Sequence, residues 1–128
     1  MKKVLLTLFL SVSSLATFCS CESKEVIPPK EFQQAIKANP YIQLVDVRTP
    51  EEYTEGHIDH ARLINIKDTI TFDKEIQSLD KQRPVFIYCR SGKRSQQAAL
   101  RLSEAGFKVI DLEGGYLNWV KQNLPVEK

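Results

Sequence analysis

Short apolar runs that alternate with segments of helical periodicity constrain the fold of this chain more than any other feature. The clearest run lies at 85–88, directly after Pro84, and a mostly apolar, β-branched run lies at 42–47. Further strands are expected at 62–66 and 109–112. Continuous apolar runs are typical of strands that are covered on both faces. Strands joined to helices through short connections predict a doubly wound parallel sheet of the α/β class. With 128 residues and 42% hydrophobic content, the chain is expected to form one domain.

Helix signals fill the intervals between these runs. Thr49, Pro50 and Glu52 have the pattern of a capping box, which predicts a helix directly after the strand at 42–47. Apolar residues at helical spacing predict further helices between Pro29 and Asn39, at 72–79, from about Ser95 to 105, and after the glycine pair at 114–115. A short edge strand is expected at 26–27.

The first 20 residues have the pattern of an export signal. A basic head at 2–3 precedes an almost wholly apolar stretch at 4–10 and a small, polar stretch up to Ser20. Residues 18–21 resemble a bacterial lipoprotein signal, so we expect Cys21 to become the mature N-terminus and to carry a lipid. Cleavage after Ala16 is the competing prediction.

These boundaries predict a signal at 1–20, a tether at 21–25 and a folded domain at 26–124. The protein is then exported, as a periplasmic protein or a membrane-anchored lipoprotein, and it meets the membrane only through the lipid. Residues 1–20 hold two of the 18 basic residues and none of the 16 acidic ones, so the chain from Cys21 onward has 16 of each. This balance predicts no basic face and no nucleic-acid partner. His57 and His60 with one cysteine match no usual metal site, and no cofactor is expected.

Cys89 follows the apolar run at 85–88 and opens the cationic loop Cys-Arg-Ser-Gly-Lys-Arg. The helix expected after this loop directs its N–H groups and its partial positive charge at the loop. Ser91 and Gly92 allow a tight turn whose N–H groups can converge on the sulfur, and Arg90, Lys93 and Arg94 add positive charge. These effects favour the thiolate, which predicts a nucleophilic or sulfur-carrying Cys89. The alternative is an inert, buried cysteine at the end of a strand.

Asp46 and Arg48 lie where the strand at 42–47 is predicted to end. Open α/β sheets bind ligands at the carboxyl edge of their strands, so these residues are candidates for the site. A structural, supporting role is favoured for both. Arg48 is then expected to pair with Glu51 or Glu52, and Asp46 to hold backbone N–H groups.

Three stretches of the chain resemble the rhodanese (sulfurtransferase) domain. The loop at 89–94, between a strand and a helix, is similar to the active-site loop of this family. Residues 44–53, with Gly-His-Ile at 56–58 and Ala61, resemble its N-terminal signature, and Gly-Gly-Tyr at 114–116 with Trp119 resembles its C-terminal signature. The resemblance covers about residues 25–124 and implies a rhodanese-type sheet and a cysteine that carries a persulfide.

The resemblance implies that Cys89 is the catalytic residue of a sulfurtransferase. It would take a sulfane sulfur from thiosulfate or a related small anionic donor and pass it to cyanide, a thiol or a protein acceptor. Loop N–H groups, including those of Ser91 and Gly92, would hold the persulfide. Arg94 would hold the loop, and the cations at 90 and 93 would attract the donor.

Two other functions remain as alternatives. Cysteine phosphatases and some arsenate reductases use a similar cradle, but their pattern places five residues between cysteine and arginine. Here four residues separate Cys89 from Arg94, and Ser95 stands at the fifth spacing. The second alternative is a non-turnover persulfide carrier or a protein-docking module with the same fold.

Overall fold

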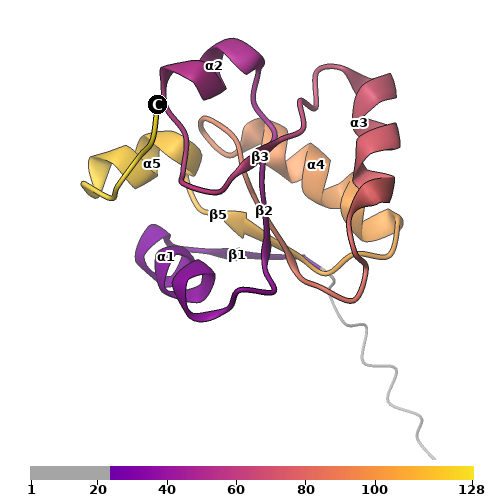
Figure 1. Cartoon of the computed structure of the whole chain (residues 1–128), viewed down its shortest axis with the longest axis horizontal. Coiled ribbons are helices and arrows are strands. Elements are labelled where there is room, and N and C mark those ends of the chain that lie inside the picture. The colour runs from indigo at the N-terminus through magenta and orange to yellow at the C-terminus, as the bar shows by residue number, and fades with distance from the viewer. Residues whose placement is uncertain (1–23) are drawn as a thin grey trace, which may run out of the picture.

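Five parallel strands form one sheet, with helices on both of its faces, in the computed structural model, which describes residues 24–128 (Figure 1). The strand order is β1-β5-β4-β2-β3, so β4 is central. The strands are β1 (Lys24–Ile27), β2 (Gln43–Asp46), β3 (Arg62–Leu63), β4 (Val85–Tyr88) and β5 (Val109–Leu112). The predicted α/β class is confirmed. The predicted signal at 1–20 and the lipid site Cys21 lie outside the described residues.

The helices divide between the two faces of the sheet. They are α1 (Pro29–Ala38), α2 (Pro50–Glu55), α3 (Thr69–Glu75), the 3-10 helix η1 (Ile76–Ser78), α4 (Lys93–Glu104) and α5 (Gly115–Lys121). In Figure 1, α1 and α5 lie on one side of the strands, and α3 and α4 lie on the other. No helix within residues 24–128 is long and apolar enough to cross a membrane.

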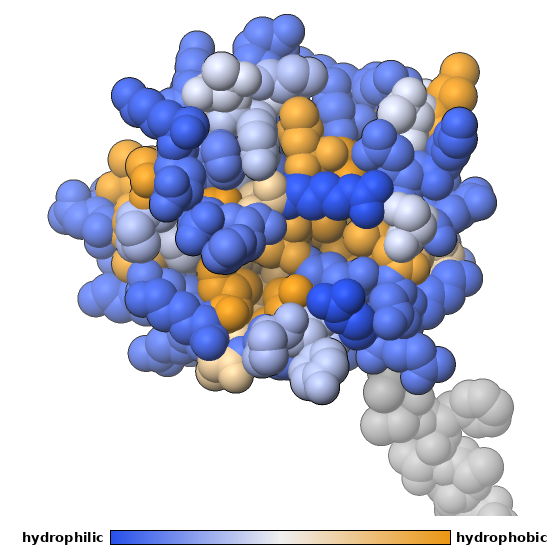
Figure 2. All heavy atoms as spheres, viewed as in Figure 1, coloured by the Kyte–Doolittle hydropathy of each residue, from blue (hydrophilic) through white to orange (hydrophobic). Residues whose placement is uncertain are grey.

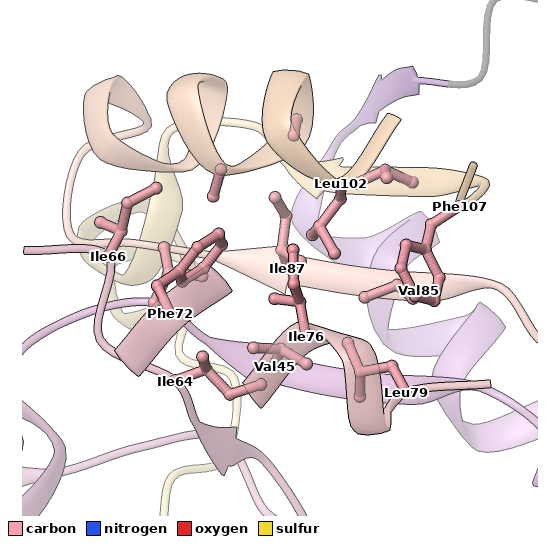
Figure 3. Close-up of a cluster of buried hydrophobic side chains, with 14 of the residues drawn as sticks. Val45, Ile64, Ile66, Phe72, Ile76, Leu79, Val85, Ile87, Leu102 and Phe107 are labelled. Atoms are coloured by element: carbon pink, nitrogen blue, oxygen red, sulfur yellow. The ribbon is translucent and has the colours of Figure 1, made fainter. Parts of the chain in front are cut away.

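Each face of the sheet has its own hydrophobic core. Phe72 of α3 and Leu102 of α4 pack against strand residues such as Ile87 in the first core (Figure 3). Phe32 and Trp119 anchor the second core under α1 and α5, with their rings 6.3 Å apart. The surface seen in Figure 2 is largely hydrophilic around a central group of hydrophobic residues. Because the strands are parallel and buried, the carboxyl ends of the neighbouring strands β2, β4 and β5 lie in fixed positions next to one another.

Two strands differ from the sequence predictions. β1 begins at Lys24, and Lys24 and Glu25 pair with β5, so part of the predicted tether belongs to the sheet. β3 is shorter than the predicted run at 62–66, because beyond Leu63 the chain follows β2 through only two bonds. The N–H of Ile64 bonds to Asp46 O, and that of Ile66 bonds to Val47 O.

Two helices begin earlier than predicted. α3 begins at Thr69 because Asp68 accepts a bond from the N–H of Thr71 and caps the helix. α4 begins at Lys93 because Gly92, with a φ of 103°, ends the preceding loop in the left-handed region. The capping box at Thr49 is present as predicted.

Candidate active site

Cys89 lies at the carboxyl edge of the central strand β4, and 1% of its surface is exposed. The chain turns through the next three residues and enters α4 at Lys93. The N–H of Gly92 donates to Cys89 Sγ at 3.0 Å. Within residues 24–128, no acceptor is found for the backbone N–H groups of Ser91 and Lys93. The N–H groups at 91–93 therefore form a small cradle after Cys89, at the positive end of a helix, in which one N–H bonds to the sulfur and two have no acceptor within the described residues.

Of the three cationic side chains of the loop, one forms an ion pair and two are exposed to solvent. Arg94 makes two bonds of 2.7 Å to the carboxylate of Glu52 in α2. This pairing lowers the pKa of Glu52 to about 2. Arg90 and Lys93 are exposed. Arg94 therefore ties the loop to α2, while the other two cations lie at the surface, where a dissolved anion can meet them.

Asp46 and Arg48 form a buried ion pair beneath this edge of the sheet. Arg48 Nη2 lies 2.7 Å from Asp46 Oδ2 and donates to Gly56 O at 2.6 Å. The guanidinium also lies 4.1 Å from the centre of the Tyr116 ring. The predicted pairing of Arg48 with Glu51 or Glu52 is wrong, because Asp46 is its partner and Glu52 pairs with the loop. Asp46 does hold a backbone N–H, that of Arg48, at 2.9 Å.

The start of α5 supports the loop from the other side. The N–H of Tyr116 donates to Cys89 O at 2.8 Å, and that of Leu117 donates to Arg90 O at 3.0 Å. Gly115 has a φ of 63°, and a Cβ placed there would lie 2.6 Å from the carbonyl oxygens of Cys89 and Arg90. Gly115 thus allows close contact between α5 and the candidate active-site loop.

Two polar residues behind the sulfur were not predicted from the sequence. Ser95 Oγ lies 3.4 Å from Cys89 Sγ and 3.0 Å from Asp111 Oδ2. Asp111 is 3% exposed, and burial raises its pKa to about 6. The available signal was a carboxylate inside the apolar run Val-Ile-Asp-Leu of β5, where charge is costly to bury.

Neither histidine hydrogen-bonds to Cys89. The His57 ring stacks on Tyr53 at 3.8 Å, and its Nδ1 lies 2.9 Å from Tyr53 O. His60 is exposed and has a φ of 65°. Within the described part of the chain, no three histidine, cysteine, aspartate or glutamate residues are grouped so as to hold a metal ion.

The rhodanese-like domain family matches residues 28–122 of the chain. The Bacillus subtilis protein YtwF is 36% identical over 104 residues, which cover 81% of this chain and 97% of YtwF. A sulfurtransferase of Allochromatium vinosum is 35% identical over 106 residues, which cover 78% of this chain and 92% of that protein. The thiosulfate sulfurtransferase GlpE of Shewanella oneidensis is 37% identical over 83 residues, which cover 64% of this chain and 79% of GlpE.

Solved structures give the same result for the fold. The crystal structure of a rhodanese-related protein from Thermoplasma volcanium matches with a TM-score of 0.72 and 28% identity, over 80% of this chain and 97% of that one. The resemblance inferred from the three sequence signatures is thus confirmed, and the relatives support a sulfurtransferase-type transferase. The chain belongs to the rhodanese-like domain family.

Proposed function

We propose that this protein is a sulfurtransferase that carries a sulfane sulfur on Cys89 as a persulfide. The observation that carries the proposal is the cradle around Cys89 Sγ, where the N–H of Gly92 donates at 3.0 Å and α4 begins directly beyond it. Such a cradle favours a negative charge on a single sulfur atom. The names of the relatives from Allochromatium vinosum and Shewanella oneidensis support the same chemistry.

The proposed reaction has two displacement steps. The Cys89 thiolate attacks the outer sulfur of thiosulfate, a new S–S bond forms, and the old S–S bond breaks with its electron pair leaving on sulfite. An acceptor nucleophile, either cyanide or a thiolate, then attacks the outer sulfur of the persulfide. Cys89 leaves as the thiolate, so the enzyme returns to its starting state. One covalent intermediate shared by two steps gives ping-pong kinetics.

The other residues near Cys89 attract the donor, stabilise the charge on the sulfur and fix the shape of the loop. Arg90 and Lys93 are exposed cations that attract the anionic donor. The N–H groups of Ser91, Gly92 and Lys93 stabilise the charge on the sulfur being transferred. Arg94 acts mainly through its pair with Glu52, which fixes the shape of the loop. Asp46 and Arg48 contribute by holding the buried edge on which the loop rests.

The small loop favours sulfur over phosphoryl chemistry. Four residues separate Cys89 from Arg94. Ser95 is the residue that follows five intervening residues, and its hydroxyl group lies near Cys89 Sγ and Asp111 Oδ2. Arginine therefore does not stand where the phosphatase pattern requires it. A persulfide carrier without turnover is the second candidate, because the same cradle would hold a persulfide received from a protein donor.

The place of action is part of the proposal. The pattern of residues 1–20 and the cysteine at 21 favour export and a lipid anchor on Cys21. The donor is then a small sulfur anion outside the cytoplasm, and the acceptor is a thiol or a protein.

The test measures sulfur transfer from thiosulfate to cyanide by the full chain and by Cys89→Ser. Mass spectrometry of the peptide that contains Cys89 then seeks the added mass of one sulfur atom. We expect thiocyanate and the adduct in the wild type and neither in Cys89→Ser. The matched control is Cys19→Ser with Cys21→Ser, which removes the other two cysteines and should keep the activity. An adduct without thiocyanate would support the carrier, and the absence of both products would contradict the thiosulfate mechanism.

A further inference from the structure

Asp111 is a buried carboxyl group for which the proposed displacement steps have no use. It lies on β5 between apolar neighbours, and 3% of its surface is exposed. Its Oδ2 lies 3.0 Å from Ser95 Oγ, and within residues 24–128 its Oδ1 has no hydrogen-bond partner. A buried carboxylate with an unpaired oxygen is costly. Burial raises the pKa of Asp111 to about 6, so both of its charge states are accessible near neutral pH.

Ser95 connects this carboxyl group to the sulfur. Its side chain is fully buried at the first turn of α4. Ser95 Oγ lies within reach of three groups: Cys89 Sγ at 3.4 Å, Asp111 Oδ2 at 3.0 Å and Gly92 O at 3.2 Å. A hydroxyl group has one hydrogen to donate and can accept two bonds. The direction of that hydrogen therefore depends on the protonation of its neighbours.

Two arrangements satisfy this geometry. When Asp111 is ionised, Ser95 donates to the carboxylate, and its oxygen can accept a bond from the thiol of Cys89. When Asp111 is protonated, the carboxyl group donates to Ser95, whose hydrogen is then free to point at the sulfur. A hydrogen bond to the anionic form of a group favours that form. Neutral Asp111 therefore suits an anionic sulfur, and ionised Asp111 suits the thiol.

The other groups around Asp111 do not replace this contact. Asp111 also lines a hollow, together with Lys24, Glu25 and Val26 of β1 and with Gln96 and Ala99 of α4. Within the described residues, Asp111 forms no ion pair. Its neighbour on β4 is the apolar Ile87, and Cys89 is the titratable group that it reaches through a hydrogen-bonded side chain.

We propose that Asp111 is a positioning residue that controls the charge on Cys89 through the hydroxyl group of Ser95. The S–H bond of Cys89 breaks as its proton passes to Ser95 Oγ. At the same time the Ser95 O–H bond breaks, and that proton forms a new O–H bond on Asp111 Oδ2. One negative charge thus moves from the carboxylate to the sulfur, and no electron is gained or lost. The inference rests on the proposed function in giving this thiolate, and the persulfide anion that follows, a catalytic use.

The experiment follows alkylation of Cys89 by iodoacetamide against pH in the full chain, measured on the peptide that contains Cys89. Asp111→Asn keeps the shape of the side chain, and its amide can donate permanently to Ser95, as a protonated carboxyl group would. We expect this change to lower the pH of half-maximal alkylation by about one unit. Glu104→Gln removes an exposed carboxylate at the end of α4 and should leave the profile unchanged.

A double-mutant cycle separates action through the hydroxyl group from a direct effect of charge. In the Ser95→Ala background, we expect Asp111→Asn to shift the profile by no more than about 0.3 unit. An equal shift in both backgrounds, or no shift in either one, overturns the proposal. Alkylation needs no sulfur donor, so it can succeed where sulfur transfer fails. The alkylation experiment therefore tests this inference independently of the sulfur-transfer experiment, which tests the proposed function.

A second measurement keeps the test decisive if Asp111→Asn fails to fold. The carboxyl carbon of Asp111 can be followed by NMR during a pH titration of the wild type and of Cys89→Ser. The proposal expects two coupled steps in the wild type and a single step in the variant, whose hydroxyl group does not ionise in this range. Superimposable titrations would contradict it.

Discussion

Glu52 joins two parts of the sequence that looked separate, the capping box of α2 and the cationic loop after β4. Its carboxylate accepts a bond from the N–H of Thr49 at 3.0 Å and two bonds from Arg94 at 2.7 Å. The charge of Arg94 is therefore largely neutralised in the folded protein. The attraction of an anionic donor then depends on Arg90, on Lys93 and on the N-terminus of α4, while Arg94 fixes the geometry of the loop.

This pair predicts an acid-sensitive contribution to stability. The pKa of Glu52 falls from 4.5 to about 2 on pairing, so the folded state binds fewer protons than the unfolded state. The contribution is present above about pH 4.5 and is lost as the pH falls toward 2. At pH 7 we expect Glu52→Gln to lower the free energy of unfolding by about 1–2 kcal/mol, since the pair is partly exposed. Urea unfolding at pH 7 and pH 2 measures this difference.

The matched control for Glu52→Gln is the neighbouring residue. Glu51 is exposed, and Glu51→Gln should change the free energy of unfolding by less than about 0.5 kcal/mol at either pH. A loss of stability in Glu52→Gln that persists undiminished at pH 2 would show that the ion pair with Arg94 is not its cause.

At the scale of elements, the starts of α4 and α5 enclose the loop between them. The carbonyl groups of Cys89 and Arg90 accept hydrogen bonds from the N–H groups of Tyr116 and Leu117 at the start of α5. α5 is anchored in turn by Trp119, which is 1% exposed in the second core. The candidate site therefore depends on a helix that follows it in the sequence and packs on the opposite face of the sheet from α4.

Gly115→Ala tests this dependence. An added Cβ would lie 2.6 Å from the carbonyl oxygens of Cys89 and Arg90, so the loop and α5 have to separate. We expect sulfur transfer to fall at least about tenfold, because misplacement of a site by about 1 Å can cost about a hundredfold. The control is Gly106→Ala, where φ is 96° but the nearest atoms lie 3.8 Å away, on the flexible side chain of Lys81. This control should lose about 1 kcal/mol of stability and keep its activity. Equal losses of activity in both variants would contradict the role of α5.

The strands could be predicted from the sequence more completely than the contacts of the candidate site. The runs at 85–88 and 109–112 were predicted with their observed bounds because buried strands are mostly apolar. The cradle at Cys89 was predicted because its parts are neighbours in the chain. The pairing of Arg94 with Glu52 spans 42 positions, and that of Ser95 with Asp111 spans 16. Such contacts are set by strand order and helix packing, which periodicity does not give.

The early start of β1 had a similar cause. Lys24 and Glu25 are polar and largely exposed, so no hydrophobic pattern marks them as a strand. Their backbone groups pair with β5 because the sheet offers an open edge there. For the same reason, the sequence of β1 does not show that it lies beside β5 at Asp111, where Val26 is the paired residue.

At the scale of the whole molecule, a carboxyl group buried beside the first core makes stability depend on pH. Burial raises the pKa of Asp111 from 3.8 to about 6, so between these values the folded state binds more protons than the unfolded state. This group therefore lowers the free energy of unfolding as the pH rises from about 4 to 6, the opposite direction to Glu52.

Asp111→Asn should remove this dependence. A shift from 3.8 to about 6 corresponds to about 1–3 kcal/mol. We expect the free energy of unfolding of the variant to exceed that of the wild type by that amount at pH 7. At pH 4 the two should match closely, because Asp111 is then neutral in the folded protein. Urea unfolding across this range measures the difference, with Glu113→Gln, an exposed carboxylate directly after β5, as the control. Parallel curves for Asp111→Asn and the wild type would mean that the carboxyl group is accommodated equally well in both charge states. A curve that converges at low pH would instead show that the fold tolerates a destabilising charge next to Ser95, the residue that links it to Cys89.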